Sequence, residues 1–168
     1  MGDQFNIDTA NSNVSSFTGQ VDSQTITVTT TGNVDTGSGF ATIKPISDGS
    51  LTDLIFTPAG PTLFGDFSFR GQLLDAAVGT VTVTVTDNQG DPAQTFTFTG
   101  LGSNADFASI GIEAVLGSGE TIKTVEIAST FKEVKQIEFS LADVPEPASL
   151  LLLGTGLLAL GLVRRKRA

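Results

Sequence analysis

The chain has 168 residues, the usual size of one domain, and carries 9 basic residues against 18 acidic ones. Four of the basic residues crowd the last five positions, so residues 1–147 hold only five and have a net charge of −13. Such an acidic surface repels the phosphates of nucleic acids. The chain also lacks His and Cys, which excludes Ser–His and Cys–His catalysis, thiolate metal sites and disulfides. We expect no cofactor.

Residues 1–24 are polar and poor in large apolar groups, which predicts an irregular polar leader or an edge strand. Met1–Asn6 has neither the basic region nor the apolar region of a secretory signal peptide. We therefore expect the export signal to lie upstream of this sequence.

Residues 25–143 are predicted to form a β-sandwich ectodomain, because apolar residues alternate there with Thr, Ser or charged residues. Gly, Pro and Asp clusters separate the candidate strands. Eight or nine short strands favour an all-β fold with an antiparallel, jelly-roll-like sandwich. Besides the hairpin described below, the candidates are Gly39–Ile43, Leu51–Phe56, Phe64–Arg70, Phe107–Ala114, Thr121–Ala128 and Lys135–Leu141, with a weakly signalled helical turn at Ala128–Val134.

The sequence Val34-Asp35-Thr36-Gly37-Ser38 resembles the Asp-Thr-Gly element of aspartic proteases, in which two such aspartates share a proton. This chain has one copy, so a dimer would have to complete the pair. The polar residues on either side favour an ordinary hairpin loop at this position.

The clearest strand pattern is Thr80–Thr86, in which Val alternates with Thr, and the alternation resumes with Phe and Thr in Thr95–Thr99. A hairpin that pairs Val85 with Phe96 and Val83 with Phe98 would turn all of these apolar side chains toward the core. The Thr side chains would then form a flat array of hydroxyls. Such an array is able to bind ice or a polysaccharide. Thr is also a strong strand former that tolerates water, so a solvated face is favoured.

The turn between these strands contains Asp87, Asn88 and Asp91, which are weak candidates for calcium ligands. Their spacing does not match an EF-hand loop, and a plain Gly-Asp turn is favoured. The 18 carboxylates would permit glycoside hydrolysis, yet nothing in the sequence marks two of them as a pair. We expect no enzymatic activity.

The C-terminal residues 144–168 differ sharply from the rest of the chain. Residues 144–149 contain Pro145-Glu146-Pro147, which forbids helix and strand and predicts an extended, accessible segment. Residues 148–163 are uncharged and rich in Leu, and as a helix they would span roughly 24 Å of the bilayer. The positive-inside rule places the basic cluster Arg164, Arg165, Lys166 and Arg167 in the cytoplasm and the ectodomain in the periplasm.

These three elements, in this order, resemble the PEP-CTERM sorting signal. The resemblance implies recognition of Pro145, Glu146 and Pro147 by an exosortase-type sorting protease, removal of the anchor, and delivery of the ectodomain to the cell surface or the exopolysaccharide matrix. Those residues would belong to a substrate, and the bilayer and exopolysaccharide would be further partners. The alternative to a sorting signal is a linker bounded by Pro residues before an ordinary membrane anchor.

The sequence therefore predicts a non-catalytic exported surface or extracellular-matrix protein from a bacterium. A carbohydrate-binding or adhesive β-sandwich module is the alternative, and an enzyme ranks third.

Overall fold

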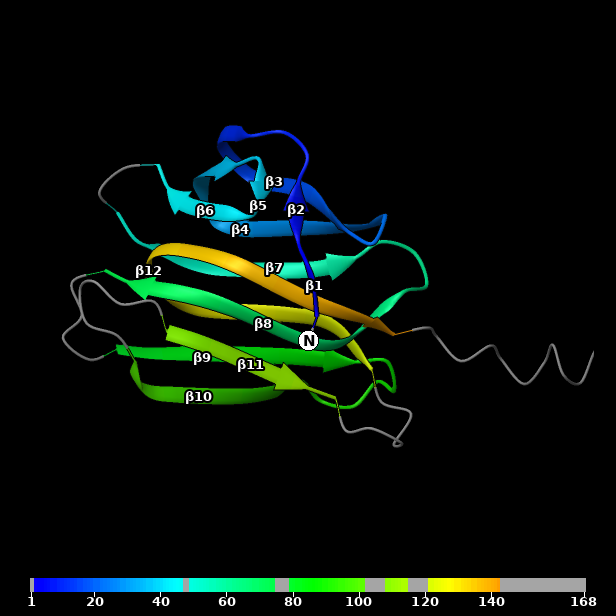
Figure 1. Cartoon of the computed structure of the whole chain (residues 1–168). Helices are drawn as coiled ribbons and strands as arrows, with labels where there is room; N and C mark the ends of the chain where they lie inside the picture. Colours follow the sequence, from blue (N-terminus) through cyan, green and yellow to red (C-terminus); the bar gives the residue numbers. More distant parts are fainter. Residues whose placement is uncertain (1, 47–48, 75–78, 102–107, 115–120, 143–168) are drawn as a thin grey trace, which may run out of the picture.

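The computed structural model describes residues 2–46, 49–74, 79–101, 108–114 and 121–142. Within these ranges all regular secondary structure is β, which confirms the all-β prediction (Figure 1). Among the described residues no helix is long and apolar enough to cross a membrane. The helix expected at residues 148–163 lies outside them. The strands are β1 (Asp3–Gln4), β2 (Asn6–Ile7), β3 (Asn11–Val21), β4 (Gln24–Gly37), β5 (Gly39–Phe40), β6 (Thr42–Pro45), β7 (Leu51–Pro58), β8 (Leu63–Leu73), β9 (Gly79–Asp87), β10 (Gln94–Leu101), β11 (Ala108–Glu113) and β12 (Ile122–Ala142).

The strands form two antiparallel layers that share three long strands. The first layer runs β10-β9-β12-β7-β4-β3 and uses the N-terminal half of β12. The second layer runs β11-β8-β12-β6-β4-β3 and uses its C-terminal half. Because β3, β4 and β12 cross from one layer to the other, the sandwich is closed along that side. On the opposite side, β10 pairs only with β9 and β11 only with β8 among the described residues.

The helical turn expected at Ala128–Val134 is wrong, because these residues lie inside β12. Ile127, Phe131 and Val134 follow one another at intervals of four and three residues, which imitates a helix face. All three are nevertheless buried in a strand. The pairing register of β12 shifts between Ala128 and Phe131 and again between Phe131 and Glu133, and these irregularities return the apolar side chains to the inner face.

Phenylalanine rings fill the space between the two layers. The Phe139 ring of β12 stacks on Phe64 at 4.2 Å between centroids and also contacts Phe67, Phe56 and Phe5. Seven Phe side chains are almost completely buried, because Phe has no polar group that would favour contact with water. They are Phe5, Phe56, Phe64, Phe67, Phe69, Phe131 and Phe139.

The N-terminal residues also contribute to the core. Phe5, between β1 and β2, is buried, and its N–H donates a hydrogen bond to the Ile137 carbonyl oxygen at 2.9 Å. Its ring lies against Gly19 of β3, where an added Cβ would come within 2.5 Å of ring carbon Cε2. Only glycine permits this close approach. Long-range contacts therefore hold the N-terminal segment in place.

The hairpin of β9 and β10 is confirmed, but its register differs by two residues from the predicted one. Val85 pairs with Gln94 instead of Phe96, and Val83 pairs with Phe96 instead of Phe98. A shift of two residues leaves every side chain on its predicted face. The expectation that Phe96 is buried is wrong, however, since its side chain is 41% exposed. Strand β10 forms the edge of the first layer, and little covers this ring there.

Candidate functional site

The threonine array predicted on β9 and β10 is present on the outer face of the first layer. Thr80, Thr82 and Thr84 lie directly opposite Thr99, Thr97 and Thr95. The Oγ1 atoms of Thr84 and Thr95 are 3.2 Å apart and form a hydrogen bond. Hydroxyls that pair with each other on an open strand face are typical of a solvated sheet surface, as the sequence analysis favoured.

Asp35 of the Asp-Thr-Gly element lies within β4, and the hairpin turn expected in this region begins only at Ser38, where the chain turns back toward β6. Its Oδ1 atom accepts hydrogen bonds from the Ser12 hydroxyl at 2.6 Å and from the Asn13 N–H at 3.0 Å. Both bonds favour the charged carboxylate, so they lower the pKa of Asp35. Asp35 therefore holds the irregular part of β3 against β4, and we assign it a structural role.

Removing the Ser12 hydroxyl tests this assignment. We expect Ser12→Ala to raise the pKa of Asp35 toward its ordinary value. The substitution removes the hydrogen bond from Ser12, which lowers this pKa more than the bond from Asn13 does. A lowered pKa in the folded state contributes stability above the pKa of the unfolded state, and this contribution disappears as the pH falls through the folded value. An NMR titration of the Asp35 carboxyl carbon measures the change. Ser109→Ala on the distant strand β11 should leave the titration unaltered, and an unaltered pKa in Ser12→Ala would refute the assignment.

The turn after β9 engages the weak calcium candidates in hydrogen bonds to the backbone. Asp87 Oδ1 accepts the N–H groups of Gln89, Gly90 and Asp91 at 2.9, 2.9 and 3.2 Å. Asn88 Oδ1 accepts the Thr121 N–H at 3.1 Å, which ties the turn to the residue that precedes β12. In the part of the chain that the structure describes, no three acidic residues are grouped as metal ligands.

Two carboxylates whose proximity the sequence does not reveal are Asp3 of β1 and Asp22, which follows β3. A hydrogen bond that the protonated Asp22 carboxyl donates to Asp3, together with the repulsion between the two charges, raises the pKa of Asp22. Both side chains are exposed. They line neither of the two hollows described next.

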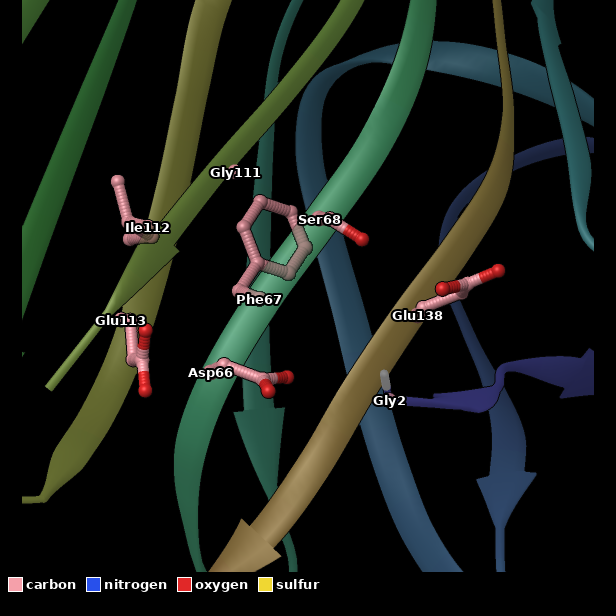
Figure 2. Close-up of a pocket in the computed structure, with 8 residues that line it drawn as sticks. All are labelled: Gly2, Asp66, Phe67, Ser68, Gly111, Ile112, Glu113 and Glu138. Atoms are coloured by element: carbon pink, nitrogen blue, oxygen red, sulfur yellow. The ribbon is translucent and has the colours of Figure 1, made fainter.

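The first hollow lies on the outer face of the second layer and has a volume of about 290 Å³. Figure 2 shows three carboxylates around it, from Asp66 of β8, Glu113 of β11 and Glu138 of β12. Glu113 is paired directly with Asp66 across the two strands. One Asp66 oxygen accepts the Ser140 N–H at 2.7 Å. Because this face is acidic, it favours hydroxyl or ammonium groups over anions.

The second hollow lies on the open side of the sandwich, between β11 of the second layer and β9, β10 and the start of β12 of the first. Its volume is also about 290 Å³. Val85, Ile112 and Ile122 give it apolar walls, and Phe96 stands at its side. Polar groups border the hollow at Asp87, Gln94, Glu113 and Thr121.

Thr121 is the unusual residue of the second hollow. Thr121 is only 9% exposed, and its Oγ1 atom is buried and has no hydrogen-bond partner among the described residues. Its backbone is fixed, because the Thr121 N–H donates to Asn88 Oδ1 at 3.1 Å and the Thr121 carbonyl accepts the Asn88 N–H at 3.2 Å. A rigid, buried hydroxyl without a partner is uncommon in folded proteins. Sequence reasoning missed this residue, because only the tertiary fold brings Thr121 and Phe96 to the same hollow.

The C-terminal tail carries a protein-sorting signal. Residues 143–167 match the family model of the PEP-CTERM protein-sorting motif, which confirms the resemblance drawn from the sequence. The signal implies an exported protein sorted by an exosortase. Pro145, Glu146, Pro147 and the basic cluster 164–167 lie outside the described residues.

Other comparisons add little to this result. No curated protein matches the chain. Among solved structures, one mutant form of CBM29-2, a family 29 carbohydrate-binding module, matches at 10% identity over 81% of this chain and 91% of that one, with a TM-score of 0.42. A second mutant form matches at 11% identity over 80% and 81%, with a TM-score of 0.28. Scores this low do not establish a shared fold.

Proposed function

We propose that this chain is a non-catalytic surface or extracellular-matrix protein that a membrane sorting protease processes at its C-terminal signal. The observation that carries the proposal is the match of residues 143–167 to the PEP-CTERM motif. The last described strand, β12, ends at Ala142, so the signal follows directly on the folded domain. Pro on both sides of Glu146 disfavours helix and strand, which suits a segment that a protease has to bind.

The proposed route follows from the chemistry of the tail. The uncharged stretch 148–163 partitions into the bilayer, and Arg164–Arg167 remain on the cytoplasmic side. Residues 1–147, with their net charge of −13, then lie on the periplasmic side. Cleavage near Pro145–Pro147 removes the anchor and frees the strand domain for the surface or an exopolysaccharide matrix.

Cell fractionation tests the proposal. The full chain, preceded by a secretory signal, is produced in a host that contains an exosortase and in the same host without it. We expect the strand domain to leave the membrane fraction only when the enzyme is present, because removal of the apolar stretch removes its affinity for lipid. The same membrane-bound fraction in both hosts would contradict the proposal.

A second function, carbohydrate binding or adhesion by the strand domain, is favoured by one observation. Phe96 stands 41% exposed beside a hollow that combines apolar walls with polar groups, the usual character of small-molecule sites. This function is compatible with the first, since sorting delivers the domain and binding would act after delivery.

A further inference from the structure

We propose that the hollow between β10 and β11 binds one neutral sugar unit, with Phe96 against an apolar face of the sugar ring and the Thr121 hydroxyl bonded to a ring hydroxyl. This inference rests on the second function above and names its site and ligand class.

The unpartnered hydroxyl of Thr121 points to a ligand. A buried hydroxyl without a hydrogen bond loses its bonds to water and gains nothing in return. The two hydrogen bonds between the Thr121 backbone and Asn88 hold the main chain of Thr121 in place beside the hollow. A ligand that enters the hollow with a hydroxyl group supplies the missing bond.

The position of Phe96 points to a ligand with an apolar face. Phe96 lies on the edge strand β10, and its ring borders the hollow while remaining partly open to solvent. Phe offers only its ring for contact, because it has no polar group. The C–H groups on one side of a pyranose ring form a flat apolar surface that suits such a ring.

The charge of the lining excludes anionic ligands. Asp87 and Glu113 border the hollow, and no Lys or Arg does so among the described residues. These carboxylates would repel an anion. A hydroxyl group is able to donate hydrogen bonds to the carboxylate oxygens and to the amide oxygen of Gln94. A neutral sugar is rich in hydroxyl donors and has an apolar face, so it satisfies both requirements.

The size and location of the hollow set the number of sugar units. Its volume of about 290 Å³ lies near the lower limit of ordinary small-molecule sites, roughly 300–1,000 Å³, and fits one unit. The hollow lies between the two strand edges that have no further partner among the described residues. The remainder of a polysaccharide is thus able to continue past the open side of the sandwich.

Binding can be followed by the fluorescence of a single introduced Trp, because the chain has no Trp or Tyr of its own. In Phe96→Trp the new indole is the only strongly fluorescent residue, and it stands at the proposed site. The full chain is purified in a detergent without a sugar headgroup and titrated with cellohexaose, laminarihexaose and mannohexaose. We expect a saturable change in emission with at least one of them. An alginate hexamer, which carries a carboxylate on every unit, should produce none.

Two variants of the otherwise unchanged chain locate the binding site by calorimetry. Thr121→Val removes the hydroxyl and keeps the side-chain shape, and we expect the dissociation constant to rise about tenfold, as for one lost hydrogen bond. Phe96→Ala should weaken binding by a similar factor. The matched controls Thr97→Val, on the outer face of β10, and Phe40→Ala, at an exposed ring on β5, should bind like the unchanged protein. The urea midpoint of Thr121→Val should not fall, because the hydroxyl that it removes has no partner.

Each outcome decides the proposal. Binding that weakens in Thr121→Val and Phe96→Ala, but not in the controls, supports it. Binding that survives both changes places the sugar elsewhere, which overturns the site and leaves carbohydrate binding intact. If none of the three neutral hexasaccharides binds at about 1 mM, both the site and the second function are wrong.

Discussion

Replacing Phe139 with alanine is expected to lower the free energy of unfolding by about 3–5 kcal/mol. Phe139 is fully buried, and its ring contacts those of Phe64, Phe67, Phe56 and Phe5, which come from both layers and from the N-terminal segment. Truncation leaves a cavity that rings fixed on separate strands are poorly able to fill. Urea unfolding followed by far-UV circular dichroism measures the loss.

The matched control is Phe40→Ala, since the Phe40 side chain is 63% exposed. A substitution at such a position should change the free energy of unfolding by no more than about 0.5 kcal/mol. If both variants lose the same amount, the rings around Phe139 do not form the core of the fold.

Replacing Glu146 with alanine is expected to reduce the processed fraction by more than about tenfold in a host with an exosortase. The proposed protease must recognise a short extended segment, and Glu146 carries the charge of the Pro145-Glu146-Pro147 triplet. A site built to bond a charged group leaves its own polar groups unpaired when that charge is missing, which costs about 1–3 kcal/mol or more. Quantitative immunoblotting of processed and unprocessed chains gives the ratio.

Asp143→Asn is the control for this variant, because it removes a carboxylate just outside the triplet. Its processed fraction should equal that of the unchanged chain. Normal processing of Glu146→Ala would show that the protease does not read the triplet, and the alternative of a linker before an ordinary anchor would then be preferred.

The strands were predictable where local alternation is strong, and their exact pairing was not. In β9 and β10 the alternation of Val or Phe with Thr fixes which face each side chain occupies, but a slip of two residues preserves that pattern. The turn length decides between the registers, and it places Val83 opposite Phe96. The exposure of Phe96 depends on β10 being an edge strand, which is a property of the whole sheet.

Other features were hidden because they arise from contacts between distant parts of the chain. Phe5 and Ile7 are core residues, but Phe5 lies between β1 and β2 and Ile7 ends β2, and strands of two residues are too short to show any periodicity. Strand β12 was predicted as two strands because its register shifts interrupt the alternation. The hollow at Thr121 likewise combines residues from four strands with Ala114 and Thr121 at the ends of two of them, and no local motif predicts it.

The sorting signal was readable from the sequence because it acts as a linear peptide. The Pro-Glu-Pro triplet, the apolar stretch and the basic cluster follow one another along the chain, and no tertiary structure is needed to bring them together. The match of residues 143–167 to the family model confirms that reading.

Intact-mass spectrometry of the full chain, isolated from a host with an exosortase and from the same host without it, tests the central claim most directly. We expect the enzyme-containing host to yield a chain lighter by the apolar stretch 148–163 and the basic cluster 164–167, and the other host to yield a chain that retains both. Equal masses from the two hosts, with the tail retained in each, would contradict the proposal that this protein is a sorted and processed substrate.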